Sequence, residues 1–80
     1  MNNAEFVELH AECVIAMRGY FVEAEITTAM LAKCTAEPLP FADRMSLLSQ
    51  EVIEPNAQTR YVSAKSRLHD AARLGYGFSN

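Results

Sequence analysis

Residues 4–34 contain no proline and carry apolar side chains on two opposite sides of a helix. Successive residues lie about 100° apart around a helix axis, so the positions on each side can be assigned directly. One broad stripe consists of Phe6, Leu9, Cys13, Met17, Tyr20, Phe21, Ala24 and Leu31. The opposite stripe consists of Ile15, Val22, Ile26, Ala29 and Met30. A surface helix of a monomer needs one such stripe, whereas a helix that is apolar on two sides lies buried between layers.

The second stripe predicts self-association. A chain of 80 residues buries only about 60% of its unfolded surface when it folds alone, so little of it is left to cover that stripe. We therefore expect a homo-oligomer or a protein partner at an interface formed by Ile15, Phe21, Val22, Ile26, Met30, Tyr76 and Phe78. The alternative is a break at Gly19, because glycine in a helix interior costs about 1 kcal/mol relative to alanine. Two shorter helices would then cover each other in part, which weakens the case for an oligomer.

Prolines divide the chain into three predicted helices, over residues 3–35, 41–53 and 57–74. Pro38 and Pro40 cannot continue the first helix, and Pro55 is expected to end the second. Gly75 is well placed to end the third, so residues 75–80 are expected to form a flexible aromatic tail. We predict a single all-α domain, residues 1–80, in which one long helix packs against two shorter ones.

Charge and cysteine content exclude several classes of protein. The formal net charge of −3 disfavours nucleic-acid binding. No apolar run is long enough to span a bilayer, and the first residues lack the basic region of a signal peptide, so we expect a cytoplasmic protein. Cys13 and Cys34 would lie about 31 Å apart on one continuous helix, too far for a disulfide. We expect both to be reduced.

A basic row in the last predicted helix is the best candidate for a ligand site. Lys65, His69 and Arg73 recur every four residues and so share one side of the helix, and Tyr61 stands one turn before them. At an oligomer interface the cations could hold a phosphate while the tyrosine stacks on a base. The alternative is a solvated flank whose cations pair with glutamates of the first helix.

Metal binding and catalysis have no convincing motif. His10 and Cys13 are the one close pair of metal-type ligands, and zinc needs four that converge. No serine or cysteine stands in a pattern that would activate it as a nucleophile. We therefore predict no metal, no cofactor and no enzymatic activity. Tyr76 and Phe78 in the tail either dock into a partner or fold back onto the helices.

These observations favour a non-enzymatic binding protein, an oligomeric inhibitor or adaptor that binds or shields a protein partner. In size and class it is similar to small helical proteins of phages and mobile elements, and to small secretion chaperones, an analogy that covers no specific residue. One alternative is a sponge that sequesters an anionic nucleotide at the basic row. Another is a structural subunit of a larger assembly.

Overall fold

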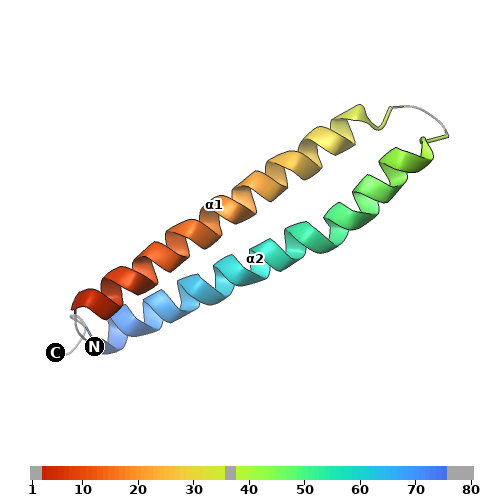
Figure 1. The fold of residues 1–80 in the computed structure, drawn as a ribbon. Coiled ribbons are helices and arrows are strands. Elements are labelled where there is room, and N and C mark those ends of the chain that lie inside the picture. The colour runs from red at the N-terminus through yellow and green to blue at the C-terminus, as the bar shows by residue number, and fades with distance from the viewer. Residues whose placement is uncertain (1–2, 36–37, 76–80) are drawn as a thin grey trace.

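The computed structural model describes residues 3–35 and 38–75, which form an antiparallel pair of helices. Helix α1 spans Asn3–Lys33 and helix α2 spans Phe41–Gly75. The helices lie side by side, and the start of α1 is next to the end of α2 (Figure 1). The described residues include no strand, which confirms the all-α class. The molecule measures 61 × 20 × 16 Å.

Helix α1 is continuous through Gly19, so the alternative of a break there is wrong. A Cβ atom built on Gly19 would meet no other atom within 4 Å. Packing against α2 therefore does not require a glycine at this position. The helix ends where the Cys34 amide donates a 3.1 Å hydrogen bond to the Leu31 carbonyl, just before the prolines that cannot continue it.

Helix α2 is also continuous, through Pro55, so the prediction of three helices is wrong. A proline inside a helix removes one hydrogen bond, here to the Glu51 carbonyl, and is expected to kink or end the helix. The Pro55 ring is exposed, so it does not enter the contact with α1. Side chains before and after it, Gln50 and Ala57, are both buried. The helix–helix contact thus continues on both sides of the proline.

Spacing of three and four residues alternates along the contact between the helices, which we call the seam. On α1 this spacing links the half-buried side chains Phe6, Leu9, Cys13, Ala16, Tyr20, Glu23, Thr27 and Met30, and Val14, Met17 and Ala24 beside them are half-buried as well. On α2 it links the less exposed side chains Leu47, Gln50, Glu54, Ala57, Tyr61, Ala64, Leu68 and Ala71. This seven-residue repeat is that of an antiparallel two-stranded coiled coil.

The core of this hairpin is very small. Among the described residues, the buried apolar side chains are Ala57, Ala64 and Ala71, at seven-residue spacing, and their small size lets the two helices approach closely. The radius of gyration is 17.9 Å, whereas a compact domain of this length has about 12 Å. The hairpin is one layer thick, so both of its broad faces are open.

Candidate functional site

Exposed apolar side chains lie on both broad faces of the hairpin, among charged residues and, on one face, the half-buried Met17 and Ala24. We call one the Phe21 face, formed by Met17, Phe21, Ala24 and Leu31 of α1 with Leu48, Glu51, Gln58, Val62 and Lys65 of α2. We call the other the Gly19 face, formed by Glu12, Ile15, Gly19, Val22 and Ile26 of α1 with Ile53, Arg60 and Arg67 of α2. Both lie beside the seam, on opposite sides of it. More than half of the Phe21, Leu31, Ile15 and Val22 surface is exposed.

Three aromatic rings join the helices near the middle of the hairpin. The rings of Tyr20 and Tyr61 stack across the seam with their centroids 6.1 Å apart, and Phe21 contacts both. The Lys65 ammonium lies 5.8 Å from the centre of the Tyr61 ring. Because Phe21 and Lys65 both reach Tyr61, they lie on the same side of the seam. This cluster joins the two helices near the middle of the hairpin.

A polar pair, Gln50 and Glu23, interrupts the apolar seam between the aromatic cluster and the end of α1. Gln50 is 4% exposed, and its Nε2 donates hydrogen bonds to the Glu23 carbonyl at 3.1 Å and to the Glu23 carboxylate at 2.8 Å. The Thr27 hydroxyl also donates to the Glu23 carbonyl, at 3.0 Å. A buried polar side chain in a coiled-coil seam specifies the register at a cost in stability. Gln50 and Glu23 therefore select one alignment of the two helices.

We expect Gln50→Ala to lower the free energy of unfolding by about 1–2 kcal/mol, because it removes two hydrogen bonds and leaves Glu23 half-buried without this partner. Urea unfolding of Gln50→Ala, Glu23→Ala and the double variant measures the coupling between the two residues. The double variant should cost about 1 kcal/mol less than the sum of the single changes. Ser49→Ala, at the exposed neighbouring position, is the control. Strictly additive losses would contradict the pairing.

A hollow lies at Gly19 on the Gly19 face. It has a volume of about 350 Å³, and its lining consists of Glu12, Ile15, Ala16, Gly19, Ala57 and Arg60. Its floor is apolar and its rim is charged. On the same face, Glu12 forms an exposed ion pair with Arg67, with 3.5 Å between Oε2 and Nη1. An exposed pair of this kind contributes little to stability.

The structure spreads the predicted basic row around α2. Tyr61 lies in the seam and stacks on rings of its own chain, whereas Lys65 and His69 are exposed. Arg73 forms a 2.9 Å ion pair with Asp70. Tyr61 and Arg73 are twelve residues apart, so their side chains point about 120° apart around the helix axis. The four side chains therefore do not converge on one surface, and the Tyr61 ring already has stacking partners.

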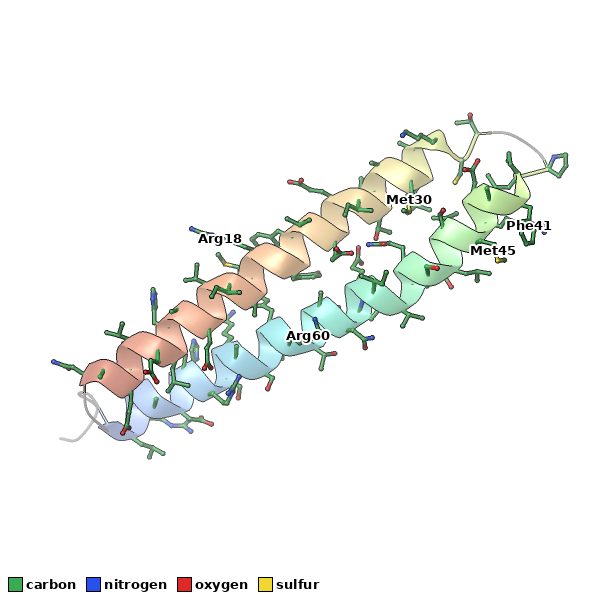
Figure 2. The ribbon with its side chains drawn as sticks, viewed as in Figure 1. Arg18, Met30, Phe41, Met45 and Arg60 are labelled. Carbon is green, nitrogen blue, oxygen red and sulfur yellow. The ribbon has the colours of Figure 1, made fainter. Side chains whose placement is uncertain are left out.

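The predicted interface residues fall in three places. Ile15, Val22 and Ile26 lie exposed on the Gly19 face, and Phe21 lies exposed on the Phe21 face. Met30 is half-buried and lies on the side of α1 that faces α2, whereas Arg18 points away from α2 (Figure 2). Tyr76 and Phe78 lie outside the described residues.

The described residues hold no group of three or more histidine, cysteine or acidic side chains placed to bind a metal ion. Cys13 is a free thiol in the seam, and Cys34 is a half-buried free thiol just after α1. The Cys34 thiol donates to the Met30 carbonyl at 3.1 Å. Within the described part of the chain, neither helix has a stretch long and apolar enough to cross a membrane.

No family model, curated protein sequence or solved structure matches this chain. A function must therefore be argued from the two faces themselves. Sequence reasoning missed the pairing of Gln50 with Glu23 because it placed the end of a helix at Pro55. The signal was present in the spacing of Leu47, Gln50, Glu54 and Ala57.

Proposed function

We propose that the chain is a non-enzymatic binding protein, a homo-oligomeric helical hairpin that binds and shields a protein partner on its Gly19 face. The observation that carries this proposal is a pair of open apolar faces on a hairpin whose buried apolar core consists of alanines. Large exposed apolar surfaces rimmed by polar residues mark sites of protein interaction.

The presence of a glycine at position 19 supports the Gly19 face as the surface that binds the partner. The residue lowers the helix propensity of α1 by about 1 kcal/mol relative to alanine, and packing within the chain does not need it. Its missing side chain creates the hollow between Ile15 and Ala57. Interface energy concentrates where a large side chain enters such a pocket.

The rim of the hollow suggests the chemistry of the partner. Among the described residues, Arg60 has no carboxylate within ion-pair distance, although it borders the hollow. An amphipathic helix that inserts a large apolar side chain and carries an adjacent carboxylate would suit both features. The partner is therefore a protein with an exposed helix of that type.

Gly19→Leu tests this proposal because it fills the hollow and improves the helix. We expect an equal or higher melting temperature, since the new Cβ meets nothing within 4 Å and leucine favours a helix over glycine. Affinity purification from cells that express the tagged chain should recover a partner with the original chain and lose it with Gly19→Leu. Arg18→Leu, one residue away and directed away from α2, is the matched control and should retain the partner. Equal recovery with Gly19→Leu would contradict the proposed site.

A further inference from the structure

An apolar stripe lies on the outer side of the first turns of α2. Its residues, which we call the Phe41 stripe, are Phe41, Met45, Leu48 and Val52, and all four are exposed. Spacing of four, three and four residues places them in one row along the helix. Figure 2 shows Phe41 and Met45 directed away from α1. Helix α1 therefore does not cover this row.

The stripe is confined to one end of α2. Beyond Val52, the same side of the helix continues at seven-residue spacing with Thr59 and Ser66, which are polar. The inner side of the first turns, which faces α1, includes the polar residues Gln50 and Glu54. These turns thus direct most of their apolar side chains outward, although a lone hairpin needs them in the seam.

The Phe41 stripe is complementary to itself. Its spacing is the same when read from either end. In an antiparallel pair of such stripes, Phe41 therefore lies opposite Val52, and Met45 lies opposite Leu48. An interface between two copies related by a two-fold axis requires self-complementarity of this kind.

Charges beside the stripe follow the same symmetry. Arg44 and Glu51 lie seven residues apart on one flank of it, and a two-fold axis brings the same flank of both copies together. With the stripes aligned as above, Arg44 of one copy is level with Glu51 of the other to within about 3 Å along the helix. The Arg44 guanidinium already lies 6.0 Å from the centre of the Phe41 ring. Among the described residues, neither charge has an ion-pair partner within the chain.

We propose that two copies of this chain pair in antiparallel orientation through the Phe41 stripe, with Arg44 of each copy bound to Glu51 of the other. The contact covers about three helical turns of α2 in each copy, so the dimer is small in area and dissociates on dilution. It rests on the homo-oligomer included in the proposed function and names the surface that forms it. Because the stripe lies opposite the seam, the Gly19 face stays open for the partner.

Charge swapping at Arg44 and Glu51 tests the contact between copies. Arg44→Glu and Glu51→Arg each place two like-charge contacts in the dimer, and each should raise the dimer dissociation constant at least about tenfold. The double variant restores opposite charges and should return the constant to near its original value. Within one chain the two residues are about 10 Å apart along the helix and form no ion pair. Recovery in the double variant therefore reports the contact between copies.

Sedimentation equilibrium at low salt, over a dilution series that starts at the highest soluble concentration, measures these constants. A monomer at every concentration, or a double variant that is no better than the single ones, would overturn the proposal. Circular dichroism of each variant verifies that the helices form.

Two valines of α2 provide a matched test that does not depend on these charges. Val52 and Val62 are similarly exposed, at 61% and 56%, but Val52 belongs to the Phe41 stripe and Val62 to the Phe21 face. Val52→Lys should dissociate the dimer and Val62→Lys should not. The reverse result would place the second copy on the Phe21 face and overturn the proposal. Because Gly19→Leu reports on partner binding at a different surface, failure of the dimer and failure of the partner site can be told apart.

Discussion

Ala64→Asp should lower the free energy of unfolding by more than about 3 kcal/mol, the largest effect expected of any single change in the hairpin. Ala64 is 3% exposed and lies in the seam between Tyr61 and Leu68, where the helices approach closely. A carboxylate there would be buried where the helices approach closely, and a buried charge is strongly destabilising even with Arg60 and Arg67 one turn away on the same helix. Urea unfolding followed by circular dichroism, at one fixed protein concentration, measures the loss.

Ser63→Asp is the matched control for this change. Ser63 is the preceding residue of the same helix and is exposed, so the same new charge should alter stability by no more than about 0.5 kcal/mol. Similar losses at both positions would mean that the seam does not pass through Ala64.

The first half of the seam follows the stripe expected from the sequence, and the second half departs from it. Phe6, Leu9, Cys13 and Tyr20 belong to both. Beyond Tyr20 the seam passes through Glu23 and Thr27, which are polar, so hydrophobicity could not identify them. A straight helix repeats every 3.6 residues and a coiled-coil seam every 3.5, and over a long helix the two patterns separate by about 20° per heptad.

This departure explains the Phe21 face. The apolar residues Phe21, Ala24 and Leu31, which the 3.6-residue pattern assigned to the core stripe, lie instead beside the seam. A lone hairpin leaves Phe21 and Leu31 more than half exposed. Sequence analysis thus predicted an excess of apolar surface correctly. Which residues form each face depends on the partner helix, and that could not be read from α1 alone.

The expected end of a helix at Pro55 shows the same dependence on packing. A proline costs a helix about 3 kcal/mol relative to alanine, which is a good reason to predict a break in an isolated segment. In the hairpin, Gln50 before the proline and Ala57 after it are both buried against α1. Contacts on both sides outweigh the local cost, so α2 continues.

Pro55→Ala should therefore raise the free energy of unfolding by about 2 kcal/mol. The change restores a backbone donor for the Glu51 carbonyl and removes the ring, a gain of about 3 kcal/mol. The greater freedom of alanine in the unfolded chain offsets about 0.4–1 kcal/mol of this. Urea unfolding measures the difference, and Asn56→Ala, at the exposed position next to it, is the control. That control should change stability by no more than about 0.7 kcal/mol.

The sign of the change in the free energy of unfolding at Pro55 distinguishes one continuous helix α2 from two helices that meet at Pro55. If Pro55 ended one helix and Asn56 began another, alanine at position 55 would loosen a rigid turn and lower stability, because the native conformation there would already suit proline. Asn56→Ala would then also cost about 1 kcal/mol, since it would remove the side chain that caps the next helix. A gain at Pro55 together with a small effect at Asn56 is expected only if α2 is one helix and its seam runs unbroken from Leu47 to Ala71.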